Sequence, residues 1–155
     1  MADLTANAYL RIWGEAELIE GVPMNGGSAI SVYKGAPLIF DANVDTDAAV
    51  LFDTNVTAAA GDVFLGIAAE SATVASGDSD GDVEAKVYVW PTIVGFISTV
   101  FALANVGDPV YMDDSGTLTA STTGNLKIGT CHWVADGYVY VRLQAPYALV
   151  AADVA

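Results

Sequence analysis

A short motif occurs twice in the chain, and this repetition constrains the fold more than any other feature of the sequence. Residues Gly35–Asp41 read GAPLIFD, and residues Gly107–Asp113 read GDPVYMD. Glycine, proline and aspartate recur in the same order and at a constant offset (107 − 35 = 72; 113 − 41 = 72). Proline fixes φ and donates no ladder hydrogen bond, so it is typical of a strand start or a sheet edge. The motif therefore predicts two strands that begin in the same way.

The segments that follow the two motifs are also alike. GDVFLGIAAE and then DGDVEAKVYVWP follow the first, and GNLKIGTCHW and then DGYVYVRLQAP follow the second. The glycines of the middle segments, Gly66 and Gly129, have a smaller offset (129 − 66 = 63), so the second copy is shorter inside. Two copies are too few for a solenoid, and 155 residues fit a single domain. We expect an N-terminal arm or first strands in residues 1–33, a two-half β domain in residues 34–146 with copies at about 35–91 and 107–146, and a C-terminal tail in residues 147–155.

The local pattern along the chain predicts an all-β fold. Short runs of β-branched and aromatic residues alternate with turn residues such as Asp80-Gly81 and Asp136-Gly137. Helical periodicity is weak, and only Asp45–Ala60 and Thr99–Asn105 leave room for a short turn of helix. The spacing of the runs predicts a small β-barrel or sandwich. Strands are expected at Ala29–Tyr33, Pro37–Phe40, Val50–Phe52, Val63–Ala69, Ala85–Trp90, Val94–Val100, Val110–Met112, Leu126–Trp133 and Tyr138–Gln144.

The charge of the chain excludes several classes of partner. There are 19 acidic residues against 5 lysines and arginines, which gives a net charge of −14. The basic residues are scattered singly, whereas a nucleic-acid-binding protein needs them to displace counterions from phosphate. Phosphate and anionic lipid would repel such a chain. We therefore expect neither a nucleic acid nor a membrane as partner.

One uncharged segment has the length of a membrane span. Val87–Gly107 carries no formal charge and is long enough to cross a bilayer as a helix. It also contains Pro91 and Gly95, and it is rich in β-branched residues, so two buried strands with a turn between them are predicted instead. The N-terminus has no basic segment followed by an apolar run, which predicts a protein made in a cytoplasm and not exported by that route.

Two segments carry residue types that anchor protein interfaces. In Tyr138–Leu143, alternation puts Tyr138, Tyr140 and Arg142 on one face of a strand, which fits either an interface or a plain solvated sheet face. Near the N-terminus, Tyr, Trp and Arg occur together, and these types dominate binding hot spots. That segment is either an arm that reaches a neighbouring subunit or a first strand packed on its own domain. Its interface candidates are Tyr9, Leu10, Arg11, Ile12 and Trp13.

The order of motifs resembles the small capsid cement, or decoration, proteins of tailed bacteriophages. The likeness covers roughly Lys34 to Leu143 and rests on G-x-P-V-Y-x-D, T-L-T, G-N-x-x-I-G and D-G-x-V-x-V-R-L, together with the earlier GDVFLGIA. The resemblance implies a β-rich subunit on the exterior of the virion capsid, usually a homotrimer, that ties neighbouring major capsid subunits together. The segment before Lys34 does not match the pattern, so the manner of attachment is the least defined part.

The catalytic inventory is thin. Cys131 is the only cysteine, which excludes an internal disulfide, and it stands beside the only histidine, His132. Adjacent residues of a strand point to opposite faces, so a Cys–His dyad is not expected, and Cys131 is predicted to be a core residue. The familiar nucleophile, zinc and phosphate-binding motifs do not occur. The sequence leaves a carboxylate pair for hydrolysis open, but it predicts a protein that is not an enzyme and has no cofactor.

An acidic loop supports an alternative function. Gly77–Asp82 alternates Asp with Gly and Ser, but Val83 and Val89 stand where an EF-hand needs Gly and Glu. A solvated hairpin is therefore expected, and Asp78, Asp80 and Asp82 are only weak candidates for a loose Ca²⁺ site. The alternative is a carbohydrate-binding or adhesion module with a Ca²⁺-dependent acidic loop. Its sugar-stacking aromatics would be Trp90, Trp133 and Tyr138.

Overall fold

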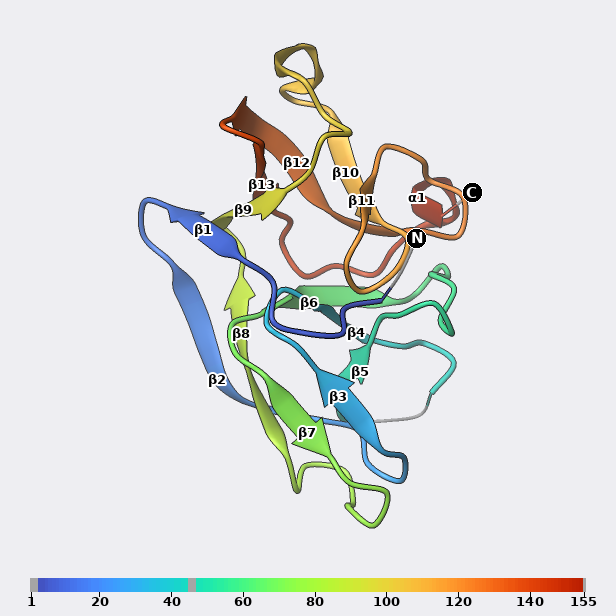
Figure 1. The fold of residues 1–155 in the computed structure, drawn as a ribbon. Helices are drawn as coiled ribbons and strands as arrows, with labels where there is room; N and C mark the ends of the chain where they lie inside the picture. The colour runs from blue at the N-terminus through green and yellow to red at the C-terminus, as the bar shows by residue number, and fades with distance from the viewer. Residues whose placement is uncertain (1–2, 45–46, 155) are drawn as a thin grey trace.

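Antiparallel strands in three sheets make up almost all of the regular structure, which confirms the all-β prediction (Figure 1). The computed structural model describes residues 3–44 and 47–154. The six-stranded sheet has the order β1 (Leu10–Trp13), β9 (Ile93–Ile97), β13 (Tyr138–Leu143), β12 (Leu126–Ala135), β10 (Pro109–Met112) and β11 (Leu118–Thr119).

The five-stranded sheet has the order β2 (Glu17–Pro23), β8 (Glu84–Val89), β6 (Val63–Ala68), β4 (Pro37–Phe40) and β5 (Val50–Leu51). A two-stranded ribbon pairs β3 (Ile30–Val32) with β7 (Ala72–Val74). Helix in the described residues is limited to a 3₁₀ turn at Leu103–Asn105 and to α1 (Ala151–Val154). No sheet closes fully into a barrel within the same residues, although an isolated bridge between Met24, after β2, and Ala49, before β5, links the two ends of the five-stranded sheet at one point.

The five-stranded sheet is the middle layer of the molecule. Alternate side chains of a strand point to opposite faces. On one face Phe64 belongs to a buried cluster with Val141 of the six-stranded sheet, and on the other Val87 belongs to a second cluster with Val74 of the ribbon. Each fully buried side chain of this size contributes about 1.5–3 kcal/mol. The two clusters therefore hold three layers together around a sheet that is buried on both sides.

Hydrogen bonds to Asp3 join two loops of the two large sheets. Its carboxylate accepts from the Thr54 amide at 3.0 Å, from the Thr54 hydroxyl at 2.6 Å and from the Ser115 amide at 3.0 Å. Burial raises the pKa of Asp3, but the hydrogen bonds from Thr54 and Ser115 outweigh this effect and lower it overall. The N-terminal segment is thus fixed across both sheets before β1 begins.

The two large sheets pair their strands in the same register. In β4 and β6, Pro37 faces Ile67 and Leu38 faces Gly66, and the register then shifts. In β10 and β12, Pro109 faces Thr130 and Val110 faces Gly129, and the register shifts at the same point. The two sets of pairs differ by the same offsets as the sequence motifs (109 − 37 = 72; 130 − 67 = 63).

In both sheets the register requires glycine at the equivalent position, Gly66 in β6 and Gly129 in β12. A Cβ atom added to Gly66 would collide with the carbonyl oxygen of Tyr88, and one added to Gly129 would collide with that of Arg142. These acceptors belong to β8 and β13, the next strands in their sheets. Each glycine therefore permits a close approach of two backbones, which a side chain would prevent.

All nine strands that the sequence predicted exist, and their boundaries differ from the predicted ones by at most three residues, at the end of β9 (100 − 97 = 3). Val87–Gly107 forms the end of β8, all of β9 and the connection to β10, and no helix in the described parts of the chain is long and apolar enough to cross a membrane. The Thr99–Asn105 expectation is met by the 3₁₀ turn. The Asp45–Ala60 expectation is wrong for residues 47–60, which contain β5 and no helix, and residues 45 and 46 lie outside the described residues.

The C-terminal residues pack onto the domain. Leu149 is buried in the cluster between the two large sheets, and its amide bonds the Asp62 carbonyl at 2.8 Å. Residues 147–154 are therefore attached to the domain along much of their length, although the sequence predicted only a tail.

Candidate interaction surface

The outer face of the six-stranded sheet gathers most of the predicted interface residues. In β13, Val139 and Val141 belong to the buried cluster, so Tyr138, Tyr140 and Arg142 point the other way. In β1, Leu10 and Ile12 pack against the same cluster, which leaves their neighbours on the outer face. The β9 strand lies between β1 and β13 and joins the two groups. The residues on this face, called the aromatic face below, are Arg11, Trp13, His132, Tyr138 and Tyr140.

Direct contacts link the members of the aromatic face. The Arg11 guanidinium lies over the Tyr138 ring at 4.0 Å from its centroid. The Trp13 ring meets Tyr140 edge-on at 5.1 Å and His132 at 5.3 Å between centroids. Aromatic pairs and cation–π contacts of this kind each contribute about 0.5–1.5 kcal/mol. Side chains from three strands therefore form one ordered platform.

Gly95 of β9 makes room for this platform. It faces Arg11 in β1 and Tyr140 in β13. A Cβ atom on Gly95 would lie 2.8 Å from the Tyr140 ring and 3.2 Å from the Arg11 Cβ. The glycine thus lets the Tyr140 ring lie across the neighbouring strand, where Trp13 covers it. Tyr140 is only 9% exposed as a result.

A bulge in β12 places His132. Cys131 faces Val141 and Trp133 faces Tyr140, so His132 is an extra residue between two paired positions. Cys131 is 2% exposed in the core, as predicted, while His132 contacts Trp13 on the outer face. Burial, and then the charge of Asp108, raises the pKa of the Cys131 thiol. The two side chains do not form a catalytic dyad.

The aromatic face holds positive charge in an acidic chain. Arg11 and Arg142 are the only arginines of the sequence, and both project from the outer side of the six-stranded sheet. A hydrogen bond with Tyr140 raises the pKa of Arg11. A partner that meets this face therefore encounters cations and π-systems, whereas the rest of the chain is rich in carboxylates.

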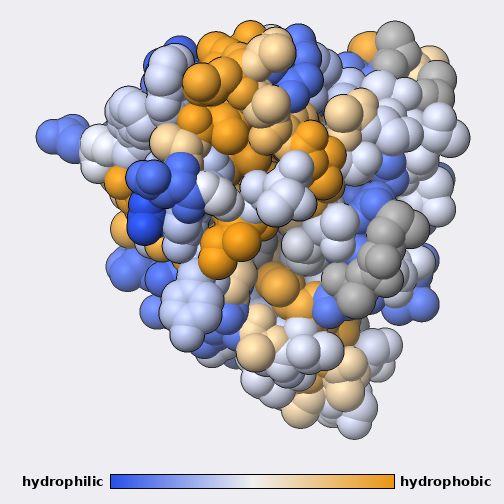
Figure 2. All heavy atoms as spheres, turned by 45° about the horizontal axis from the view of Figure 1, so that its top comes forward, coloured by the Kyte–Doolittle hydropathy of each residue, from blue (hydrophilic) through white to orange (hydrophobic). Residues whose placement is uncertain are grey.

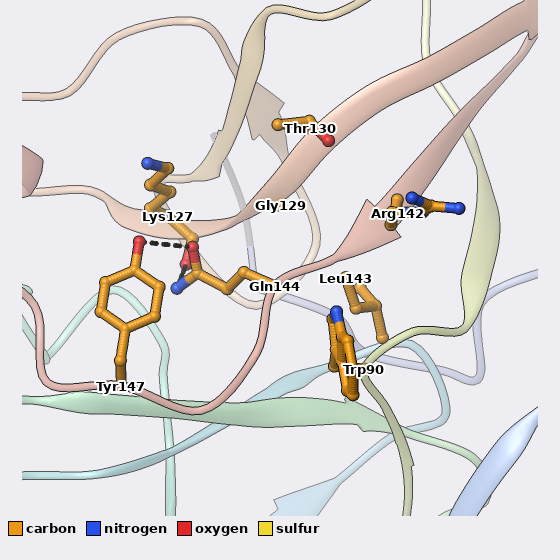
Figure 3. A pocket seen from close by; sticks show the side chains of 8 residues that line it. All are labelled: Trp90, Lys127, Gly129, Thr130, Arg142, Leu143, Gln144 and Tyr147. Atoms are coloured by element: carbon orange, nitrogen blue, oxygen red, sulfur yellow. Dashed lines mark hydrogen bonds between the residues drawn. The ribbon is translucent and has the colours of Figure 1, made fainter.

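Arg142 also borders a small hollow at the end of β13 (Figure 3). Its volume is about 180 Å³. Gln144 donates to the Lys127 carbonyl at 3.0 Å and accepts from the Tyr147 hydroxyl at 3.1 Å. Trp90, 51% exposed, forms the opposite wall. The hollow combines one flat ring with fixed polar groups.

A second exposed surface lies in the connection from β9 to β10. Figure 2 shows hydrophobic side chains gathered toward the top of that view, the end of the molecule that carries this connection in Figure 1. Phe101 anchors the connection in the core, and Asn105 accepts from the Ala102 amide at 2.9 Å. The exposed apolar residues of this apolar loop are Ile97, Val100, Leu103 and Val106.

The predicted interface residues divide into three groups. Arg11, Trp13, Tyr138 and Tyr140 meet on the aromatic face, with Arg142 further along β13. Leu10 and Ile12 face the core, and Tyr9 is 81% exposed just before β1. The segment that the sequence left as an arm or a first strand is the edge strand β1 in this structure. The sequence placed His132 on the face opposite Cys131 but did not include it among the interface candidates, and it missed Gly95, because a close approach across strands leaves no periodic signal.

The carboxylates of the acidic loop accept hydrogen bonds from nearby backbone amides. Asp78 accepts from the Ala75 amide at 2.7 Å, Asp80 from the Gly26 amide at 2.7 Å, and Asp82 from the Ser79 amide at 2.8 Å. In the described part of the chain, no group of three or more His, Cys, Asp or Glu side chains is arranged to hold a metal ion. The three aspartates stabilise turns in this arrangement.

Comparison of the chain with protein-family models, with curated proteins and with solved structures finds no significant match.

Proposed function

We propose that this protein is a structural binding module that decorates the outside of a bacteriophage capsid and ties major capsid subunits together. The observation that carries the proposal is the aromatic face, where Arg11, Trp13 and Tyr138 form an ordered surface packed around the buried Tyr140 ring on rigid strands. Tyr, Trp and Arg are the commonest anchors of protein interfaces. A platform that is ordered before binding loses little side-chain entropy when a partner covers it.

The proposal includes a repeated architecture. The two large sheets share strand order and register, which supports two copies of one structural unit stacked on each other. In β6 of the first copy, Phe64 and Ile67 pack in the core, and the equivalent residues of β12 are Lys127 and Thr130 (127 − 64 = 63). In β8, Tyr88 packs against the core, and the equivalent residue of β13 is Arg142 (142 − 88 = 54). Under this proposal, the second copy has exchanged a buried face for a polar one that meets a partner.

The proposal also includes a homotrimer. Copies with a charge of −14 repel one another, so they associate best through surfaces without carboxylates. The apolar loop is such a surface, since residues 97–107 carry no formal charge. We assign self-association to the apolar loop and capsid binding to the aromatic face. The protein is then made in the host cytoplasm and ends on the capsid exterior.

The mechanism needs no bond-making. A protein that binds only the assembled shell stabilises it by an amount set by affinity and concentration, about 2.7 kcal/mol per site at 100 times Kd. A trimer that contacts several capsid subunits at once gains further from effective concentration.

Quantitative mass spectrometry of gradient-purified virus particles tests the proposal. A copy number comparable to that of the major capsid protein is expected. Purified chain should also rebind particles that lack it, and Trp13→Ala should weaken rebinding at least tenfold. Trp90→Ala is the matched control, since Trp90 is an exposed tryptophan outside the aromatic face. Absence of the chain from intact particles would contradict the capsid role.

A glycan-binding module is the second candidate, and the hollow of Figure 3 favours it. An exposed tryptophan beside Gln144 and Arg142 offers a flat apolar surface with polar groups at its rim. Under this function, Trp90→Ala should abolish binding on a glycan array and Trp13→Ala should not. Because the carboxylates of the acidic loop already accept from backbone amides, EDTA should leave that binding unchanged.

A further inference from the structure

The β2 strand is a free edge of the five-stranded sheet. It pairs with β8 on one side. Within the described residues no strand pairs with the other side of Glu17–Gly21, and the Pro23 carbonyl at the end of β2 accepts from the Ala49 amide at 2.7 Å. The run Glu17–Gly21 at its start is exposed throughout, so neither a loop nor a helix of the described chain covers the edge. A strand edge without a cover presents backbone donors and acceptors to any extended chain that reaches it.

An apolar groove lies along one face of the sheet at this edge. Its volume is about 450 Å³, within the range of ligand pockets. Ile19 of β2 and Trp90 form half-exposed walls, at 50% and 51% exposure, and Val87 and Val89 of β8 lie in the lining. Among the described residues no charged side chain lines the groove, although the chain as a whole is strongly acidic.

An acidic hollow of about 260 Å³ lies on the opposite face at the same edge. Alternation along β8 puts Glu84 and Lys86 on the face opposite Val87 and Val89. Glu20 and Glu70 complete the hollow, and Lys86 pairs with Glu20 at 3.3 Å. Three carboxylates against one ammonium leave the hollow with a net negative charge.

A bulge in β2 lies between the apolar groove and the acidic hollow. The pairing of β2 with β8 shifts register between Ile19 and Val22, and Gly21, inside the shift, lines both the groove and the hollow. An extended segment placed beside β2 would send successive side chains to alternate faces of the sheet. One set would enter the apolar groove, and the other would enter the acidic hollow.

We propose that the free edge of β2 binds an extended segment of a partner protein in which apolar residues alternate with lysine or arginine. The segment adds a strand to the five-stranded sheet, its apolar side chains fill the groove beside Ile19, and its cations meet Glu20, Glu70 and Glu84. Main-chain hydrogen bonds supply affinity in this mode, and the apolar groove and the acidic hollow supply specificity. The site is separate from the aromatic face, and it stands whether or not the protein decorates a capsid.

Peptide binding to the full chain tests the proposal. The probe is a short peptide in which four valines alternate with four lysines, at physiological salt. The control has the same composition, with four valines followed by four lysines, so it carries equal charge without the alternation. We expect NMR shift changes at Leu18–Gly21 and slower amide exchange there with the alternating peptide only. Equal effects of the two peptides would overturn the proposal, because charge alone would then explain binding.

Three variants locate the site. Ile19→Glu should weaken binding of the alternating peptide at least tenfold, whereas Val150→Glu, an exposed apolar position near the C-terminus, should leave it unchanged. Glu84→Lys should weaken binding about two- to fivefold and improve binding of a valine–glutamate peptide. Far-ultraviolet circular dichroism checks that each variant is folded. Binding that survives Ile19→Glu in a folded protein would refute the assignment.

Discussion

At the residue scale, a missing group affects two side chains: Tyr140, beside a glycine that has no side chain, and Asp113, which has an oxygen without a hydrogen-bond partner among the described residues. Tyr140 reaches over β9 only because Gly95 has no side chain, and Trp13 then covers the ring. Asp113, at the end of β10, has a buried carboxylate oxygen, Oδ1, without a hydrogen-bond partner among the described residues. The first arrangement stabilises a surface, and the second costs stability.

Gly95→Ala should destabilise the protein by about 1–3 kcal/mol, because the new methyl group would overlap the Tyr140 ring and force it to move. Urea denaturation gives the change, and near-ultraviolet circular dichroism should report the displaced aromatic rings. Gly77→Ala is the control, since an added Cβ there meets nothing within 4 Å. An unchanged aromatic spectrum in Gly95→Ala would contradict the packing described here.

Asp113→Asn should stabilise the protein at neutral pH. Burial raises the pKa of Asp113, and the charge of Asp114 raises it further. A raised carboxyl pKa gives stability that is fully present below the unfolded value, about 3.9, and is lost as pH rises through the folded value. The gain in the free energy of unfolding that Asp113→Asn gives should therefore shrink as pH falls toward the pKa of the unfolded carboxyl group. Urea denaturation at several pH values measures it, with Asp136→Asn in an exposed turn as the control.

At the scale of single elements, the glycines of β6 and β12 decide whether the sheets form. Gly66→Ala and Gly129→Ala should each cost more than about 3 kcal/mol, because the added atom would meet a backbone carbonyl oxygen that no rotamer change removes. Soluble yield and thermal denaturation measure both, again against Gly77→Ala. A small loss at either position would show that the register is looser than described.

Sequence patterns found the strands with a clear alternation and missed the short strands β7 and β11 and the exposed strand β2. Val139 and Val141 alternate with Tyr138 and Tyr140, so β13 has a clear period of two. The β2 strand follows GEA and reads ELIEGVP, a mixture without alternation that suits a helix as well as a strand. Its structure depends on pairing with β8 and on the Thr92 hydroxyl, which bonds the Glu17 amide at 2.8 Å. Such tertiary contacts leave no local signal.

The sequence predicted which residue types form the candidate surface, but it did not predict how they are arranged on the sheet. Tyr, Trp and Arg near position 11 and near position 140 were recognised as interface types from the sequence. Their meeting on one face depends on β9 lying between β1 and β13, and sheet order is set by long-range pairing. Leu10 and Ile12 were placed with them because the segment was considered as an arm, whereas in a strand alternate residues turn inward.

At the scale of the whole molecule, the proposed homotrimer must overcome the repulsion between copies that each carry a charge of −14. Leu103→Glu in the apolar loop should weaken self-association at least tenfold, since it adds a carboxylate to a surface that would be buried between like-charged copies. Sedimentation velocity over a range of concentrations measures the effect. The control is Ile19→Glu, an exposed position in β2. Equal weakening by both variants would indicate charge repulsion alone.

Because the two large sheets share one register, their corresponding faces can be compared along the stack of layers. Val87, which faces the ribbon, corresponds to Val141, which faces the five-stranded sheet (141 − 87 = 54). Corresponding faces therefore point the same way, so the layers follow one another by a step and not by a two-fold turn. The ribbon caps one end of this series, while the aromatic face leaves the other end open. Under the capsid proposal, a subunit built in this way has distinct ends and docks with a single polarity, which keeps the ribbon end pointing away from the shell.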